Sequence, residues 1–479
     1  MLALLGLSGW TQQRLNRQRV ALGITRGAQL GQTAPPVLVF TTVALGGFRG
    51  LIANALWLRA TDLQEQDKYF EKVQLADWIT KLQPHFTHVW LMQAWDMAYN
   101  ISVKFSSPRD RWLWVQRGIE LLRDEALRYN PDEPMIYREL AWFFQHKMGA
   151  DLDDAHFYYK NRWAEEMDKV LAGTNYVALI SPQTEDELAR ARLLREKYKM
   201  DPEIMRDVDN EYGPLEWRLP ESHAVYWATV GFRKSKSKDL MPLRRTLYQP
   251  LYLAFQRGRL IILNTPEGRR FQFGPNLAMI PNANRAYERM AAEDAEYRDH
   301  IKNAHRNFLK DAIYYLYTHN RRAEAEQWKR YLEEEYPNVL FTDYRQTDKP
   351  SVRVADLTLD EYAAARVTEV VGETSNIRVT SAIEGLLVTA YYNLALDLDD
   401  EAIGHERLAQ VAWDRFQRNT QKQKDRVSLA PFAQLKIDAL RAFEQTYNPE
   451  LVARLRSRLG LPAAVPSTNA VPPATGGTP

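Results

Sequence analysis

The sequence contains no cysteine, and this absence removes several kinds of chemistry at once. Without cysteine there are no disulfides, thiolate metal sites, iron–sulfur clusters or cysteine nucleophiles. The absence fits a cytosolic protein, and it fits equally well a bacterial envelope protein that avoids unwanted oxidation. Cysteine content therefore excludes chemistry but leaves the compartment open.

The sequence also lacks an excess of either charge, because 63 basic residues face 61 acidic ones and the net charge is +2. A nucleic-acid-binding protein needs a basic face that neutralises phosphates. We therefore expect no nucleic-acid partner.

Recognisable catalytic, cofactor and metal motifs are missing as well. The nine histidines show no H-E-x-x-H or H-x-H spacing, and no G-x-x-x-x-G-K-[ST] phosphate loop occurs. The acidic cluster of Asp151, Asp153 and Asp154 lacks the glycine and the final glutamate of a calcium loop. We predict no catalytic residue, no cofactor, no metal site and no enzymatic activity.

One uncharged stretch reaches membrane length. No charge lies between Arg26 and Arg49, and the apolar character continues to Leu58. Residues 35–58 would form a helix of about 36 Å, against a hydrocarbon core of about 30 Å. We predict a transmembrane helix here, preceded by a short basic cytoplasmic segment, residues 1–34.

Arg49 and Asn54 lie inside this span and leave its placement open. A central arginine costs roughly 2.5–3.5 kcal/mol. Arg49 either snorkels or pairs with a partner helix, or only the part before it is deeply buried, with Trp57 at headgroup depth. The third interpretation is a soluble core helix. We predict membrane or partner contacts at Arg49, Asn54 and Trp57.

Flanking charge predicts the orientation of the span. Arg14, Arg17, Arg19 and Arg26 precede it, whereas acidic and basic residues are mixed after Arg59. The positive-inside rule places the N-terminus in the cytoplasm. We expect a single-pass protein of the bacterial inner membrane with the bulk of the chain periplasmic.

The rest of the chain has an apolar period close to 3.6, which predicts an all-α fold. The one candidate for β structure is Arg259–Phe273, a small hairpin around a Thr-Pro-Glu-Gly turn. We predict a helical array over residues 59–338, a linker at 339–358 and a C-terminal helical region at 359–460. Residues 461–479 are rich in proline and uncharged, and they predict a disordered tail.

The spacing after two prolines indicates a helical repeat. A tetratricopeptide repeat ends on proline, and the next helix A carries an aromatic residue and then a small one at fixed offsets. Trp90 and Ala94 follow Pro84 in this way, and Tyr137, Leu140, Ala141 and Phe144 follow Pro131. The two prolines are 47 residues apart, against about 34 in a regular repeat. Asn320, Ala325 and Pro337 match the turn, the small helix-B residue and the final proline.

On these motifs the sequence resembles the tetratricopeptide-like superfamily, over roughly residues 45–340. It resembles more closely a group of bacterial proteins with an N-terminal membrane segment. The matching stretches include FRGLIANALWLRA, LADWITKLQPHFTHVWLMQAWDMAYNIS, YRELAWFFQHKMG and YGPLEWRLPESHAVYWA. The resemblance implies a degenerate helical-hairpin array, an α-solenoid, and a membrane anchor, and it carries over no catalytic residue.

Two surfaces are candidates for partner binding. A minority of the aromatic residues could line a groove for a protein partner, and for this groove we nominate Trp90, Trp95, Tyr137 and Trp142. Tyr212–Trp227 is dense in polar and aromatic residues, and it contributes Glu216, Arg218, Glu221 and His223. The predicted function is a membrane-anchored scaffold for protein–protein interaction. The alternatives are a structural subunit of a larger membrane complex and an enzyme or small-molecule binder with its site near Tyr212–Trp227.

Overall fold

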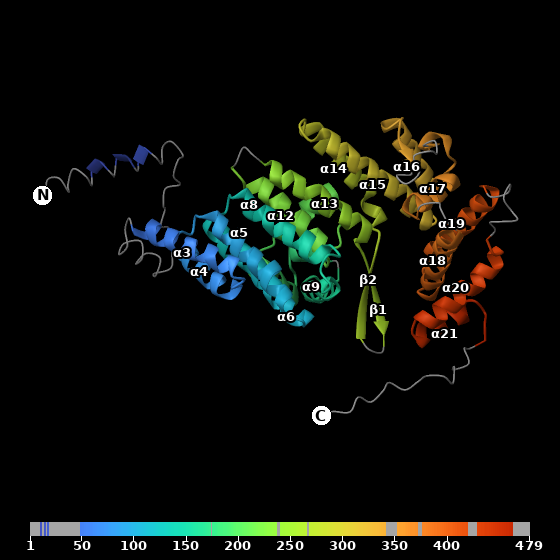
Figure 1. Cartoon of the computed structure of the whole chain (residues 1–479), viewed down its shortest axis with the longest axis horizontal. Helices are drawn as coiled ribbons and strands as arrows, with labels where there is room; N and C mark the ends of the chain where they lie inside the picture. The colour runs from blue at the N-terminus through green and yellow to red at the C-terminus, as the bar shows by residue number, and fades with distance from the viewer. Residues whose placement is uncertain are drawn as a thin grey trace, which may run out of the picture. The chain divides into compact units, whose positions relative to one another are not determined.

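The computed structural model of the chain is 78% helix and 3% strand, which confirms the all-α prediction (Figure 1). It describes residues 48–173, 175–236, 240–265, 268–341, 352–371, 376–419 and 429–462, together with six residues between 10 and 18. The chain forms two compact units. Unit 1 comprises Met1–Asp201 and His223–Leu247, and unit 2 comprises Pro202–Ser222 and Tyr248–Pro479.

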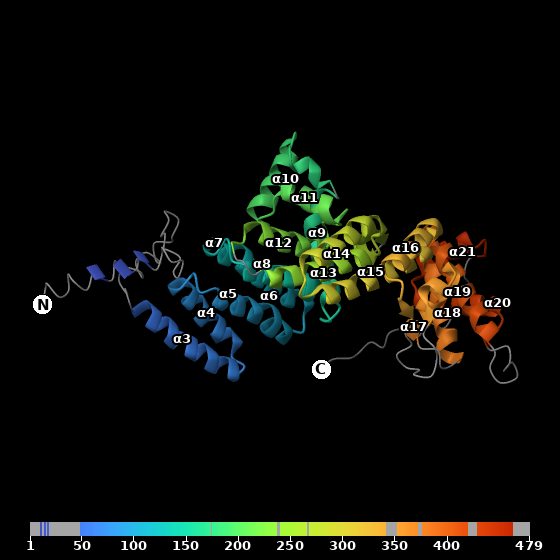
Figure 2. The same ribbon diagram turned by 90° about the horizontal axis from the view of Figure 1, so that it is seen from above.

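Unit 1 is built from short antiparallel helices. In chain order these are α3 (Phe48–Glu65), α4 (Tyr69–Leu82), α5 (Thr87–Trp95), η1 (Asp96–Ile101), η2 (Ser102–Lys104), α6 (Pro108–Glu120), η3 (Leu121–Ala126), α7 (Leu127–Tyr129), α8 (Pro134–Trp142), η4 (Phe143–Gly149), α9 (His156–Leu171), η5 (Tyr176–Leu179) and α10 (Glu185–Glu196). Figure 2 shows α3 and α4 side by side at the start of this series. The chain passes from unit 1 to unit 2 after Asp201, returns to unit 1 within α12 (Pro220–Lys234), and enters unit 2 again within α13 (Met241–Arg257).

Two consecutive helical hairpins of unit 1 repeat the same local geometry. Hairpin 1 runs from α5 through α7, and hairpin 2 runs from α8 through α9. The Trp90 indole donates to the carbonyl of Pro84 at 2.9 Å, and the Tyr137 hydroxyl donates to the carbonyl of Pro131 at 2.7 Å. Each aromatic residue therefore satisfies a carbonyl in the turn before its own helix.

The predicted small residue of helix A lies where two helices cross closely. Ala94 is fully buried, and a Cβ built on Gly118 of α6 would lie 3.0 Å from the Ala94 carbonyl oxygen. Ala141, at the same place in hairpin 2, is also fully buried. The repeat spacing predicts a small residue at position 94, and the close approach of α6 explains why a small residue is needed there.

Unit 2 is also mostly helical. Its elements are α11 (Pro202–Tyr212), β1 (Arg259–Thr265), β2 (Gly268–Gly274), η6 (Leu277–Met279), α14 (Ile280–Glu293), α15 (Arg298–Thr318), α16 (Arg322–Glu335), β3 (Leu340–Phe341), β4 (Val352–Arg353), η7 (Val354–Asp356), α17 (Leu359–Val371), α18 (Asn376–Ala395), α19 (Asp399–Asn419), α20 (Phe432–Thr446) and α21 (Pro449–Arg458). Its C-terminal core is formed by α18 to α21.

Turns between paired helices use Asn or Asp in the left-handed conformation. Asp67 joins α3 to α4 with φ 57°, Asn320 joins α15 to α16 with φ 59°, and Asp397 joins α18 to α19 with φ 61°. These side chains tolerate positive φ better than most non-glycine residues. The expected roles of Asn320 in a turn and of Ala325 on a close helix face agree with this arrangement, since Ala325 is fully buried.

The predicted β-hairpin is confirmed, because β1 and β2 pair antiparallel from Arg259–Gly274 to Thr265–Gly268. Inside the predicted linker 339–358, the structure shows a second short antiparallel pair. There Leu340 pairs with Arg353 and Phe341 with Val352. Val354 is fully buried.

The predicted membrane helix gains no support from the described residues. Residues 35–47 lie outside them, as do most of 1–34 and the tail from 463 onward. Residues 48–58 belong to α3, which continues to Glu65 and packs against α4. Within the described ranges, no helix is long and apolar enough to cross a bilayer.

Candidate functional site

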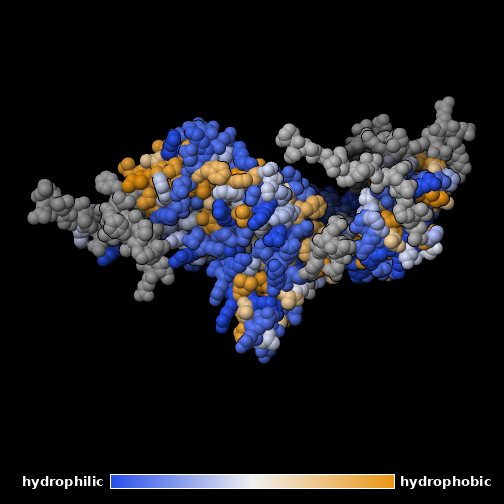
Figure 3. Space-filling view, turned by 90° about the horizontal axis from the view of Figure 1, so that it is seen from below, coloured by the Kyte–Doolittle hydropathy of each residue, from blue (hydrophilic) through white to orange (hydrophobic). Residues whose placement is uncertain are grey.

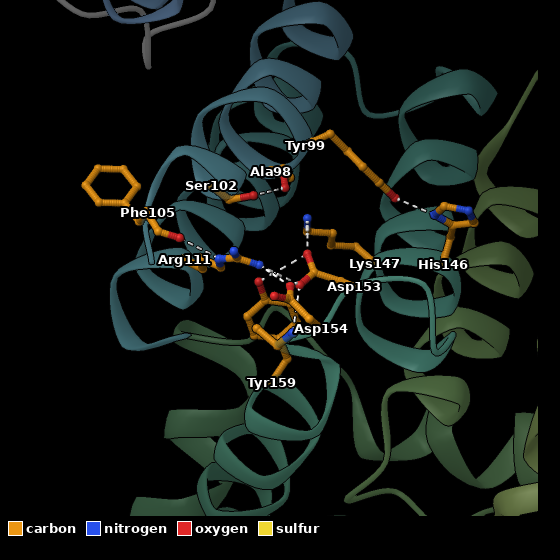
Figure 4. A network of polar contacts seen from close by, with 11 residues as sticks. Ala98, Tyr99, Ser102, Phe105, Arg111, His146, Lys147, Asp153, Asp154 and Tyr159 are labelled. Carbon is orange, nitrogen blue, oxygen red and sulfur yellow. Dashed lines mark hydrogen bonds and ion pairs between the residues drawn. The ribbon is translucent and has the colours of Figure 1, made fainter. Parts of the chain in front are cut away.

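Two stacked pairs of partly exposed aromatic side chains join the two hairpins of unit 1. Trp95 stacks on Tyr99 with ring centroids 4.1 Å apart, and Trp142 stacks on His146 at 4.5 Å. The Tyr99 hydroxyl lies 3.1 Å from His146 Nδ1 and connects the two pairs (Figure 4). We call Trp95, Tyr99, His146 and Trp142 the aromatic ladder.

The ladder follows directly from the repeat. Tyr99 and His146 are separated by 47 residues, and so are Trp95 and Trp142. In both hairpins an α-helix ends at the tryptophan and a π-helical segment begins at the next residue, η1 in hairpin 1 and η4 in hairpin 2. The ladder's tyrosine and histidine lie within these segments. Such segments are rare and frequently lie at functional sites.

Trp95 is the most exposed member, at 39% of its surface, whereas the other three are half-buried. Arg138 lies over the Trp142 ring at 5.9 Å, and the Lys147 ammonium lies over the Tyr99 ring at 5.0 Å. Two cations therefore face the π-electrons of the ladder. The ladder therefore offers a partly exposed aromatic surface with Arg138 at its edge and the buried Lys147 beneath Tyr99.

The surroundings keep the titratable groups of the ladder neutral. Burial lowers the pKa of His146 below its usual value, and the neighbouring charge of Lys147 lowers it further. Burial raises the pKa of Tyr99, and Glu139 adds to this effect. At neutral pH His146 is therefore an uncharged ring, which suits stacking on Trp142.

A polar network, buried except for Asp154, supports the ladder from below (Figure 4). Asp153 accepts hydrogen bonds from Lys147 Nζ at 2.6 Å and from the Ala155 N–H at 2.9 Å. Arg111 lies 3.3 Å from the same carboxylate, pairs with Asp154, and donates to the Phe105 carbonyl at 2.6 Å. We call Arg111, Lys147, Asp153, Asp154 and Tyr159 the Asp153 network.

The charges of this network balance each other inside the fold. Burial would raise the pKa of Asp153, but the hydrogen bonds from Lys147 and Ala155 hold it below its usual value. Burial lowers the pKa of Lys147, and the Asp153 carboxylate offsets part of that effect. The network ties the loop after η4 to α6 and so fixes Lys147 under Tyr99. The role of the Asp153 network is therefore structural support for the ladder.

The predicted groove residues divide into two groups. Trp95 and Trp142 lie together in the ladder. Trp90 and Tyr137 are buried to within a few per cent, where Trp90 stacks on Tyr129 and Tyr137 on Trp227. The latter two are packing residues of the hairpins.

The residues nominated from Tyr212–Trp227 fall in different units. Arg218 and Glu216 form a buried two-point ion pair in unit 2, with distances of 2.7 and 2.8 Å. Glu221 of unit 2 is also buried. His223 belongs to unit 1 and packs between Phe144 and Trp163 at 5.2 and 4.9 Å.

The predicted membrane contacts are distributed around α3. Trp57 is half-buried against Phe86 and His88, at 5.6 and 5.7 Å, and Asn54 is exposed. Arg49 begins the first turn of α3, and its side chain lies outside the described residues.

Neither Tyr99 nor His146 is among the site residues predicted from the sequence. The signal that could have found them is the 47-residue offset, which carries Trp95 onto Trp142 and Tyr99 onto His146. In the part of the chain that the structure describes, no group of three or more histidine or acidic side chains could hold a metal ion.

No protein-family model matches this chain, and neither a curated protein nor a solved structure matches it. A functional proposal must therefore come from the geometry of the chain itself.

Proposed function

We propose that this protein is a membrane-anchored, tetratricopeptide-like scaffold of the bacterial envelope whose aromatic ladder binds a protein partner. The observation that carries the proposal is the joining of the two hairpins by two stacked, partly exposed aromatic pairs that a hydrogen bond connects. Tryptophan, tyrosine and arginine dominate the binding energy of protein interfaces. The ladder and the neighbouring Arg138 combine these residue types on a rigid support.

The rigidity of the ladder favours binding over simple packing. Lys147 is fixed by Asp153, and Arg138 is held near Trp142 and Glu139, with a distance of 3.2 Å to the Glu139 carboxylate. Side chains that are ordered before binding lose little conformational entropy on binding. The membrane anchor in this proposal comes from the uncharged stretch before Arg49, and the repeat fold comes from the tetratricopeptide-like spacing.

The test is site-specific photocrosslinking of the full chain in its native membranes. A photoreactive benzoyl-phenylalanine replaces Trp95 in one protein, and in a matched control it replaces Trp328, a half-buried tryptophan of α16. We expect a discrete crosslinked product from position 95 and none from position 328. Equal products from both positions would show non-specific capture.

The identified partner then allows an affinity measurement. Trp142→Ala should weaken binding roughly 30-fold, as expected for a hot-spot residue worth about 2 kcal/mol. Trp328→Ala serves as the control and should bind like the parent protein. If Trp142→Ala folds normally and binds with unchanged affinity, the ladder is not the binding site.

A further inference from the structure

Helix α3 has one face packed into unit 1. Ala53, Ala60 and Leu63 are buried on this face to 5% exposure or less. Ala53 belongs to a small core that also contains residues of α4 and α5. The opposite face of α3 is exposed and can contact a partner outside unit 1.

This outer face is mostly apolar in its first half, where Asn54 is the exposed polar residue. Leu51 and Leu58 are exposed at 69% and 68%, and Ile52 and Ala55 are exposed beside them. Spacings of four and three residues bring Leu51, Ala55 and Leu58 onto one side of a helix. Figure 3 shows hydrophobic residues gathered over this N-terminal end of unit 1. Isolated exposed leucines are ordinary, but a continuous patch marks an interaction site.

The polarity of the outer face changes along the helix. Asp62 and Glu65 occupy it in the last turns, and both are exposed. At its other end α3 continues directly from the uncharged sequence that begins after Arg26. The outer face of α3 therefore becomes more apolar toward the predicted anchor and more polar toward Glu65.

We propose that the outer face of α3 lies in the membrane interface, with Leu51, Ala55 and Leu58 against lipid and Asp62 in water. The inference rests on the membrane anchoring in the proposed function. Continuity with the uncharged stretch selects lipid as the occupant, because an anchor in the uncharged sequence between Arg26 and Arg49 would hold this face at the bilayer surface. Arg59, exposed beside Leu58, can pair with anionic headgroups. The bilayer would then hold α3, the first helix of the array, parallel to the membrane surface.

The absence of cysteine makes a site-specific test direct. Single variants Leu51→Cys, Leu58→Cys and Asp62→Cys of the full chain are labelled with an environment-sensitive fluorophore. They are reconstituted into vesicles of phosphatidylcholine with phosphatidylglycerol. Leu152→Cys is the matched control, because Leu152 is exposed at 74% and lies outside α3, in the loop before α9.

We expect the emission to shift to shorter wavelength at positions 51 and 58, with no shift at 62 and 152. Lipid-soluble quenchers should reduce the emission at 51 and 58 alone. Co-sedimentation with vesicles measures the anchor separately, and crosslinking at Trp95 measures partner binding. Sedimentation without a shift at 51 and 58 would overturn this inference and leave the proposed function intact.

A second outcome would also overturn it. If the shift at Leu51→Cys and Leu58→Cys appears in detergent without vesicles and increases with protein concentration, a second copy of the chain covers the face. Circular dichroism melts of each variant establish that the labelled proteins are folded, as their exposure predicts.

Discussion

Hairpin 1 and hairpin 2 have the same local geometry but different buried chemistry. The first π-helical residue is Asp96 in hairpin 1 and Phe143 in hairpin 2, and both are buried. Asp96 lies 2.5 Å from the Lys72 ammonium, and both side chains are 2% exposed or less. Lys72 belongs to α4, the helix before hairpin 1, and the residue 47 positions later is Ile119 of α6, the helix region before hairpin 2, which is also buried. One repeat unit buries an ion pair where the other buries two apolar side chains.

The comparison separates what a repeat position requires from what it tolerates. Shape is required, because a side chain must fill the space between neighbouring helices. Charge is tolerated only when a partner comes with it, since an unpaired buried charge is costly. Lys72 and Asp96 are therefore both replaced at the equivalent positions, by Ile119 and Phe143, so that no single charge is left buried without a partner.

The largest expected effect comes from breaking the ion pair that joins Lys72 of α4 to Asp96 of hairpin 1. Lys72→Met leaves the Asp96 carboxylate buried without its cation, which should lower the free energy of unfolding by about 3–5 kcal/mol. Urea denaturation of the full chain, followed by circular dichroism, measures this change.

The double variant is the control for that experiment. Lys72→Met combined with Asp96→Leu places two apolar residues at these positions, as Ile119 and Phe143 do 47 residues later, and it should recover most of the lost stability. If the double variant is as unstable as Lys72→Met, the two hairpins are not equivalent at this position.

A smaller effect is expected where the helices of hairpin 1 cross. A Cβ on Gly118 would lie 3.0 Å from the Ala94 carbonyl oxygen and 3.1 Å from the Phe143 ring. Gly118→Val should therefore cost about 1–3 kcal/mol through overpacking. The matched change in hairpin 2, Glu165→Val, affects a side chain that is 41% exposed and should stay within about 0.5 kcal/mol. Thermal melts compare the two variants, and equal losses would contradict the close crossing.

The smallest effect concerns the one titratable difference within the ladder, His146 where hairpin 1 has Tyr99. Burial and Lys147 lower the pKa of His146, so folding favours its neutral form. The unfolded chain then binds more protons below about pH 6.5, and this contribution to stability is present above that pH and lost below it.

His146→Tyr copies the residue of hairpin 1 and should remove that dependence. The difference in unfolding free energy between pH 7.5 and pH 5.5 should shrink by less than about 1 kcal/mol, because His146 is partly exposed. The other histidines, including His305, whose pKa burial lowers to about 4, contribute equally to both proteins. An unchanged pH dependence would show that His146 does not titrate differently on folding.

The sequence predicted the parts of unit 1 that depend on short-range spacing. An offset of six residues relates Pro84 to Trp90 and Pro131 to Tyr137, and the structure shows the same hydrogen bond in both pairs. The sequence predicts two members of the ladder, Trp95 and Trp142, but not the other two, Tyr99 and His146. Their pairing requires two helices to lie side by side, and no spacing within one helix reports that.

The amino-acid sequence by itself determined the helical class, the positions of the turns and the β-hairpin, because periodicity, proline and Asx residues act over a few residues. It also determined the absence of thiol chemistry. Tertiary structure decided which tryptophans are buried and which form the ladder, and it decided that residues 48–58 pack as part of α3. Burial depends on neighbours that are distant in sequence, and only the folded chain brings those neighbours together.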